Sequence, residues 1–415
     1  VTSIYVLADT IIIGKGLGSV AMAALNIALP IYNVFFGLGL LFGVGGSVLM
    51  SIFRGRGEKE KADAYFTASF LLNILIWLLL LVVSVVFMED IAWLLGGTEE
   101  TMPYIMDYIP YIIWGMGAYF LSAFLQTFVR NDGAPKLSMI AVVSGGVLNV
   151  VLDIVFVFPC KMGMAGAAIA SVLGSVLTTV ILLFHFRSKS NGLHFSLKKF
   201  SPVFITNIYK NGFTSFLVEV SSGIVMFVFN LQILKYIGDI GVSMYGVITN
   251  TAIVVICLCN GINQASQPII STNHGAGLID RIETVKKLGL KTAFIICSVP
   301  AVLGLIVPNL FTYIFMNPNE QILSLSSTAI RIYFVGFFVI GLNMFIIGYF
   351  QSTVKPQLSL FLCLSRGCVL AIIFVFVLPP LIGVIGIWIS VPLAEFITLI
   401  AGIYFLKKNE KERIA

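Results

Sequence analysis

Long apolar segments recur along the whole chain, separated by short charged or Gly- and Pro-rich pieces. Twelve segments are found, at 1–13, 20–53, 63–88, 103–129, 137–158, 164–186, 208–236, 241–268, 288–316, 324–350, 357–379 and 384–406. About 20 apolar residues are what an α-helix needs to cross a bilayer. Open strands would leave backbone groups unsatisfied in lipid. The sequence therefore predicts an all-α polytopic membrane protein with twelve transmembrane helices.

The composition excludes the main alternatives. Hydrophobic residues make up 59% of the chain and charged residues only 11%, which is too little polar surface for a water-soluble domain. The apolar segments also lack the strict alternation of an outer-membrane barrel.

The chain carries an internal repeat with a shift of about 220 residues. The matches are Gly18 with Gly238, Ser51 with Ser271, Gly55-Arg-Gly57 with Gly275-Ala-Gly277, Gly163-x-x-Gly166 with Gly383-x-x-Gly386, and, at one residue more, Pro135-x-Leu137-Ser138 with Pro356-x-Leu358-Ser359. A duplication of this length in so apolar a chain predicts two homologous six-helix lobes, as in membrane carriers. Because six is even, the two lobes are expected to be parallel repeats.

The repeat and the charges predict four regions. They are an N-terminal six-helix lobe at 1–186 in which the start of the first helix is missing, a cytoplasmic linker at 187–207, a C-terminal six-helix lobe at 208–406 and a charged cytoplasmic tail at 407–415. Of 25 Lys and Arg residues, 20 fall in alternate connections between segments. The positive-inside rule places these basic connections and the C-terminus in the cytoplasm. Topology explains the basic loops, so we expect no nucleic-acid partner.

The Gly-x-Gly loops after the second and eighth segments are expected to be tight turns, since neither has the context of a phosphate-binding loop.

Charged side chains inside a bilayer are costly and mark ion or substrate paths. In the N-terminal half, Asp9 and Asp153 are predicted to lie at similar depth, below the ends of their helices at Gly14 and Pro159. Asn149 lies one turn from Asp153, and Ser171 reaches a similar depth. Two acids, an amide and a hydroxyl at one level predict an oxygen-lined site for Na⁺. A proton could take the place of the metal ion, because two adjacent carboxylates repel each other when both are ionised. The alternative is a structural hydrogen-bond network between helices.

Three further ionisable residues, Glu219, Arg366 and Glu395, lie within segments of the C-terminal half. Their simplest interpretation is a charge cluster that lowers the cost of burial, and a share in proton coupling stays open. The acids are not repeated between the halves. With a shift of 220 residues, the counterpart of Glu395 in the first half is Ser175, and the counterpart of Asp153 in the second half is Ile373.

The six cysteines and three histidines are scattered, so we expect no disulfide framework, no cofactor and no metal site beyond the Na⁺ site. The histidines fall in or beside cytoplasmic connections, which disfavours a membrane-embedded enzyme. A channel is also conceivable, but duplication with asymmetric buried acids favours a carrier.

Several motifs follow one another along the chain. They are Asp9-Thr-Ile-Ile-Ile-Gly14, Ala24-Leu-Asn-Ile-Ala-Leu-Pro30, Gly55-x-Gly57 with Glu58-Lys-Glu-Lys-Ala62, Arg130-Asn-Asp-Gly-Ala-Pro-Lys136, Asn149-Val-Val-Leu-Asp153, Gly261-x-x-Gln264-x-x-Gln267-Pro268, Gly275-Ala-Gly277, Gly386-Ile-Trp388 and Glu395. In this order they resemble the multidrug and toxic compound extrusion (MATE) family, most closely its bacterial MepA-like branch. The resemblance covers essentially the whole chain.

The resemblance implies a twelve-helix, two-lobed antiporter that exports organic, often cationic, compounds in exchange for sodium or protons. It also implies that Asp9, Asn149, Asp153 and Ser171 form the cation site, with Ser171 where some members have Thr. The expected location is the bacterial plasma (inner) membrane, the expected partners are small organic substrates and membrane lipid, and a monomer would suffice. The alternative is a flippase for a lipid-linked precursor, which would favour a cationic cavity for pyrophosphate. The sequence leaves the coupling ion and the natural substrate open.

Overall fold

The computed structural model describes residues 2–315 and 320–414, and the described part of the chain is almost entirely helical and contains no strand. The chain divides into two compact units, Val1–Val220 and Ser221–Ala415. The boundary falls inside one long helix, α9 (Val203–Tyr236).

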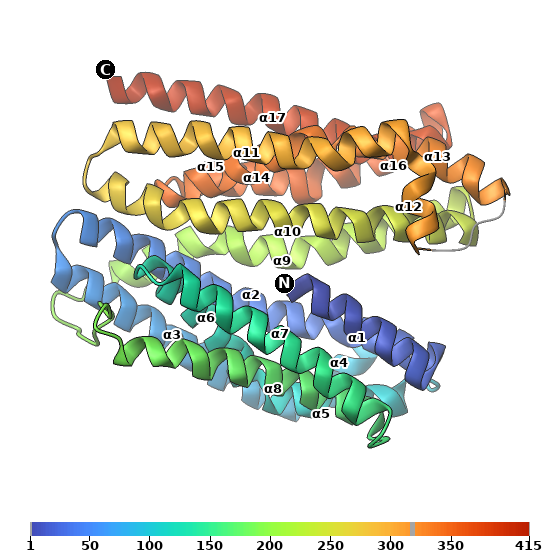
Figure 1. Ribbon diagram of the computed structural model, residues 1–415, viewed down its shortest axis with the longest axis horizontal. Helices are drawn as coiled ribbons and strands as arrows, with labels where there is room; N and C mark the ends of the chain where they lie inside the picture. Colours follow the sequence, from blue (N-terminus) through green and yellow to red (C-terminus); the bar gives the residue numbers. More distant parts are fainter. Residues whose placement is uncertain (1, 316–319, 415) are drawn as a thin grey trace. The chain divides into compact units, whose positions relative to one another are not determined.

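The first unit contains the helices coloured blue to green in Figure 1. They are α1 (Thr2–Leu17), α2 (Ser19–Gly55), α3 (Lys59–Val86), α4 (Met88–Leu94), α5 (Met102–Trp114), α6 (Met116–Asn131), α7 (Pro135–Val157), α8 (Gly163–Leu183), a short 3₁₀ turn η1 (Phe184–Arg187) and the first part of α9.

The second unit begins with the rest of α9. It continues with α10 (Asp239–Gly275), α11 (Ile279–Ile306), α12 (Pro308–Phe315), α13 (Glu320–Phe334), α14 (Phe337–Ser352), α15 (Pro356–Leu364), a π-helical turn η2 (Ser365–Val369), α16 (Leu370–Ile382) and α17 (Val384–Ile414). Both predicted lobes are thus built from the same sequence of elements, but the helix α7 of the first repeat corresponds to three pieces in the second.

The predicted all-α membrane fold is confirmed. Among the described residues, 10 helical stretches are long and apolar enough to cross a membrane. An eleventh span results if α5 and α6 are counted as one helix, bent by 51° at Gly115. The remaining predicted segment, 1–13, corresponds to α1, which has 16 residues. The bend at Gly115 was not predicted. Packing explains the glycine at the bend, because a Cβ at this position would lie 2.2 Å from the Val172 side chain.

The connections after the second and eighth predicted segments are tight turns, as predicted. Gly57 and Gly277 adopt φ angles of 78° and 72°, which are left-handed conformations that glycine adopts without strain. Gly18 and Gly238, another repeated pair, likewise have φ angles of 92° and 83° at the starts of α2 and α10. The sequence repeat is therefore also a repeat of backbone geometry.

The connection between the two predicted lobes is shorter than expected, because α9 begins at Val203 rather than near residue 208. This connection is fixed to the first unit. The Asp132 carboxylate, at the end of α6, accepts hydrogen bonds from Arg54 and from the backbone N–H of Gly192, and it contacts the His185 ring. At the other end of the chain, the predicted tail continues α17 as helix to Ile414.

The first part of α9 packs tightly against α2. A Cβ on Gly212 would lie only 1.8 Å from the backbone oxygen of Leu41, and one on Gly45 would lie 2.2 Å from that of Ile208. The two helices therefore touch backbone to backbone, as small residues allow inside membranes.

The Gly212→Ala variant is expected to lower the melting temperature of the purified protein, because the added methyl group forces α9 away from α2. Overpacking of this kind typically costs about 1–3 kcal/mol. Gly223→Ala is the matched control on the same helix, since a Cβ there meets nothing within 4 Å. Equal melting temperatures for the two variants would contradict the contact.

Candidate functional site

Helix α7 supplies two of the four residues predicted to form the cation site. Asn149 and Asp153 lie one turn apart on its buried face and are 2% and 0% exposed. The same face carries the small residues Gly145 and Gly146, so α8 can pack closely beside the polar side chains. An ionisable side chain without exposure to solvent needs a partner or a bound ion.

Helix α1 brings Asp9 to this face, where the carboxyl side chain is buried. The helix packs against α7 and α8. A Cβ on Gly16 would lie 2.7 Å from the Val157 side chain, so the approach to α7 is close. The helix continues past Gly14, its predicted end, to Leu17.

Ser171, on α8, joins the other residues into one network. The Asn149 amide donates a hydrogen bond to the Ser171 hydroxyl at 3.1 Å, and this hydroxyl donates to Asp9 Oδ2 at 3.2 Å. The side chains of Asp9 and Asp153 also lie within interaction range of each other. The structure thus brings all four predicted residues together, from three helices of the first unit.

The network leaves oxygen atoms available. Four buried oxygens of the cluster, Asp9 Oδ1, Asn149 Oδ1 and both carboxylate oxygens of Asp153, accept no hydrogen bond of ordinary geometry from a described donor. Carboxylate and amide oxygens are the ligands that hard cations prefer. The same two carboxylates could instead share a proton. The donor set therefore fits Na⁺ and fits a proton.

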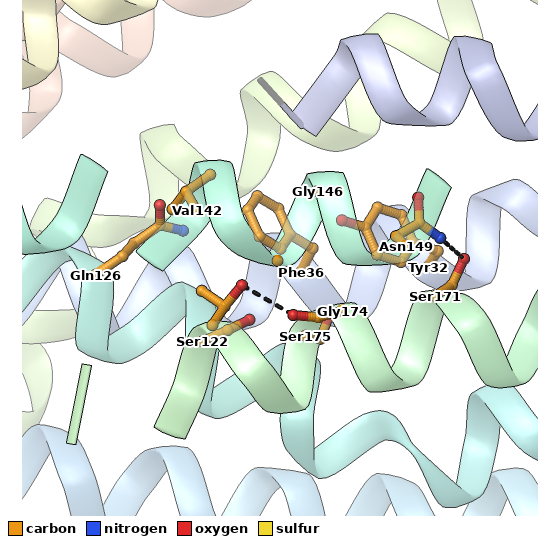
Figure 2. Close-up of a pocket in the computed structure, with 12 residues that line it drawn as sticks. Tyr32, Phe36, Ser122, Gln126, Val142, Gly146, Asn149, Ser171, Gly174 and Ser175 are labelled. Carbon is orange, nitrogen blue, oxygen red and sulfur yellow. Dashed lines mark hydrogen bonds between the residues drawn. The ribbon is translucent and has the colours of Figure 1, made fainter. Parts of the chain in front are cut away.

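A cavity adjoins this cluster within the first unit. It is small, with a volume of about 20 Å³ available to the centre of a water molecule, and it is lined by uncharged side chains and glycines of α2, α6, α7 and α8. The lining residues are Tyr32, Phe36, Ser122, Gln126, Val142, Gly145, Gly146, Asn149, Ser171, Gly174, Ser175 and Thr178. Figure 2 shows Asn149 and Ser171 at one end of this lining and Gln126 with Val142 at the other. Asn149 and Ser171 thus belong both to the acid cluster and to the cavity wall.

The predicted charge cluster of the second half is divided by the structure. Arg366 and Glu395 form an ion pair in the second unit, with 2.6 Å between Arg366 Nε and Glu395 Oε1. Glu219 lies on α9 in the first unit, where it adjoins Gly37 of α2. A joint role for Glu219 and the ion pair stays a prediction.

Sequence reasoning missed Asn343, the third member of the ionic cluster. Its amide donates hydrogen bonds to Glu395 Oε2 and to the Glu395 backbone oxygen, both at 2.7 Å. Asn343 is uncharged and lies inside an apolar segment, so the sequence did not indicate that it binds an ionised side chain. Glu395 itself did imply that polar partners must exist.

The close pairing of Asp9 and Asp153 should make the stability of the folded protein depend on pH. At high pH both carboxylates are ionised and repel each other inside an apolar environment, which destabilises the folded state. We therefore expect the melting temperature in sodium-free buffer to fall as the pH rises above about 4, the ordinary pKa of an Asp side chain in an unfolded chain. Asp9→Asn should make this fall smaller by removing one charge. Asp90→Asn changes an exposed acid and should leave the fall unchanged. An unaltered pH dependence in Asp9→Asn would contradict the close pairing.

Comparisons with known proteins agree with this architecture. The MatE family model matches residues 1–155 and 213–377. The multidrug export protein MepA of Staphylococcus saprophyticus is 26% identical over 397 residues, which cover 93% of this chain and 86% of that protein. The protein of the same name from Staphylococcus aureus strain N315 is 24% identical over 418 residues, covering 97% and 90%.

Solved structures share the fold. An outward-facing multidrug resistance MATE family transporter of the MOP superfamily gives a TM-score of 0.90 at 24% identity, over 98% of this chain and 92% of that one. A MOP superfamily transporter from Pyrococcus furiosus, described as having a binding pocket of reverse polarity, gives a TM-score of 0.89 at 24% identity over the same shares. Because the family model covers well over half of the chain, including Asp9, Asn149 and Asp153, the chain belongs to the MatE family.

Proposed function

We propose that this protein is a multidrug efflux antiporter, which exports organic, chiefly cationic, compounds in exchange for protons or sodium. The observation that carries the proposal is the Asp9–Asn149–Asp153–Ser171 cluster and its shared wall with the cavity. A site with two acids and no described basic side chain suits a positively charged occupant. A lipid-linked pyrophosphate, the cargo of the alternative flippase, would need the opposite charge.

Exchange follows from competition for the same negative charge. An organic cation near the cluster is stabilised by the ionised carboxylates. Sodium bound to the free oxygens of Asp9, Asn149 and Asp153, or a proton on either acid, neutralises that charge and weakens the hold on the drug. Each ligand therefore favours release of the other, and a ligand gradient can drive transport if the two occupied states differ in conformation. The wall of the small cavity beside the cluster carries uncharged hydrogen-bonding groups and two aromatic rings, which are side chains of the kind that line sites for organic molecules.

The relatives support the substrate class. The staphylococcal relatives are named multidrug export proteins, and one structural neighbour is described as a multidrug resistance transporter. At 24–26% identity these names support export of drugs as a class and leave the individual substrates open.

We infer that the protein resides in the bacterial plasma membrane. Its basic connections and C-terminus would face the cytoplasm, because 20 of the 25 Lys and Arg residues fall in alternate connections. Alternating exposure of the sites of one chain is sufficient for the exchange, so a monomer would suffice.

Ethidium efflux from proteoliposomes tests this function. Sodium and proton gradients are imposed separately on vesicles that contain wild-type protein or Asp153→Asn. We expect wild-type efflux to follow at least one gradient, and we expect efflux to fall to the protein-free rate in Asp153→Asn, because the neutral amide cannot exchange a charge. The gradient that drives efflux identifies the coupling ion.

Asp90→Asn, an exposed acid of the same lobe, is the matched control and should transport like wild type. Efflux by Asp153→Asn at the wild-type rate, or wild-type efflux that ignores both gradients, would contradict the proposal. A complete lack of ethidium efflux from folded wild-type protein would direct the search toward a lipid or another single substrate.

A further inference from the structure

Two cysteines of the second unit lie against each other in its interior. Cys259 is on α10 and Cys297 is on α11, and both are free thiols, 2% and 0% exposed. One thiol donates a hydrogen bond to the other sulfur, with 3.1 Å between the two Sγ atoms. The contact therefore joins two helices at positions that are 38 residues apart in the sequence.

Close helix packing brings the two sulfurs together. Cys297 lies in the buried stripe of α11, whose small members are Gly289, Ala293, Ala301 and Gly304. Helices α10, α11 and α14 pack against one another. A Cβ on Gly341 of α14 would lie 2.6 Å from Cys297 Sγ and 3.2 Å from Cys259 Sγ. The backbone of α14 therefore holds both sulfurs in place from one side.

The repeat does not share the thiol pair. Helices α10 and α11 begin 220 residues after α2 and α3, so the counterparts of Cys259 and Cys297 are Gly39 and Trp77. In the first unit an aromatic ring packs at this junction, since a Cβ on Gly117 of α6 would lie 2.7 Å from the Trp77 ring. The fold can thus fill the junction without sulfur.

We propose that Cys259 and Cys297 form a reversible oxidation site, at which a peroxide converts the two thiols into a disulfide that links α10 to α11. A disulfide bond is about 2.05 Å long, so the sulfurs need to approach by about 1 Å. Two sulfurs bonded to one metal ion at about 2.3 Å each, at tetrahedral or wider angles, would lie farther apart than the observed 3.1 Å. The contact therefore favours a disulfide over a soft-metal site. This role concerns the second unit alone and does not depend on the transport activity proposed above.

The reaction balances with hydrogen peroxide as the oxidant. One sulfur, as its thiolate, attacks a peroxide oxygen and breaks the O–O bond, which gives a sulfenic acid and a hydroxide that takes up the thiol proton as water. The second thiol attacks the sulfenic sulfur, forms the S–S bond and releases a second water. The two sulfurs lose two electrons in total, and the peroxide gains them.

The position of the pair makes this reaction feasible despite burial. An isolated buried thiol is largely unreactive. Here the outer face of α11 is exposed at Ile295 and Val299, on either side of Cys297, so a single helix separates the sulfurs from the protein surface. Hydrogen peroxide is small and uncharged, which allows it to enter where a larger reagent cannot. Once one sulfur is oxidised, its partner is already in contact, so the second step requires no diffusion.

Peptide mass spectrometry of the whole folded chain in detergent tests the site. The protein is treated with hydrogen peroxide, catalase removes the excess, and the denatured protein is blocked with N-ethylmaleimide and digested without reductant. We expect peptides joined through Cys259 and Cys297 to form at least about tenfold faster than oxidation products of Cys257 or Cys160, because the contacting thiols need no diffusion to react with each other. Dithiothreitol should restore both thiols.

Cys257 is the matched control on the same helix. It lies two residues from Cys259, so its side chain points about 200° away around α10, and it is more exposed than Cys259. Cys257→Ser should leave the link intact, whereas Cys259→Ser should abolish it. Cys160, which is exposed in the first unit, reports the oxidation that follows solvent access alone.

The link should also raise the stability of the protein. A bond between positions 38 residues apart restricts the unfolded chain. We expect the oxidised wild type to melt at least about 5 °C above the reduced wild type, and peroxide to give Cys259→Ser no such gain. Complete linkage without a rise in melting temperature would contradict the stabilising effect.

Either of two results would overturn the oxidation site itself. The first is oxidation of Cys160 and Cys257 while Cys259 and Cys297 remain thiols in the folded protein. The second is a link to Cys297 that persists in folded Cys259→Ser. The wild-type measurement requires no substitution, so it decides whether the pair is oxidised even if Cys259→Ser fails to fold.

Discussion

The cost of holding charge in an apolar interior shapes both units of this protein. Each unit carries buried carboxyl groups, and each satisfies them differently. In the second unit a guanidinium and an amide complete the hydrogen bonding of Glu395. In the first unit, Asp153 and Asp9 have no described basic partner, and they interact with each other and with Asn149. A bound cation or protonation of a carboxyl group would remove the unfavourable negative charge there.

Close backbone packing determines where this chemistry can occur. Glycine at positions 145 and 174 lets α7 and α8 approach each other directly, which places Asn149 and Ser171 within hydrogen-bonding distance. A bulky residue at either position would separate the helices and open that hydrogen bond. In the second unit the residue at the first of these positions is Arg366, whose side chain reaches Glu395 of α17. A single position in the repeat therefore decides whether the two helices meet through a glycine or through a charged side chain.

Much of this architecture was accessible from the sequence, for identifiable reasons. The spans follow from long apolar runs, and the repeat follows from glycines and prolines whose backbone roles tolerate few substitutes. The four residues of the acid cluster were found because polar groups are rare in such segments and helical periodicity indicates their depth. The structure then brought Asp9, Asn149, Asp153 and Ser171 into one network, which spacing alone could not establish. Whether this network binds a coupling cation stays a prediction.

The parts that the sequence did not reveal depend on contacts between distant segments. At the 51° bend, Gly115 packs against the Val172 side chain of α8, and nothing in the local sequence indicates this contact. Asn343 resembles any neutral residue of an apolar helix until Glu395 is placed beside it. The sequence does not predict the π-helical turn at Arg366 either, because the neighbouring residues have ordinary helical propensities. Glu219 was grouped with Arg366 and Glu395 by its place in the chain, but the boundary inside α9 assigns it to the first unit.

The two halves illustrate how a duplicated membrane protein can become asymmetric without changing its fold. The repeat preserves the turns at Gly57 and Gly277, because these glycines determine how consecutive helices connect. Interior positions face a different constraint, since any polar residue there must be satisfied inside the protein or by a ligand. Replacing Ser175 by an acid at the repeated position would create an unpaired charge unless a base such as Arg366 arose nearby. A carboxylate at the position of Glu395 therefore depends on its base, whereas Asp9 and Asp153, with no described base beside them, depend on a bound cation or on protonation. The two halves thus share the turns at Gly57 and Gly277 and differ in how their buried acids are neutralised.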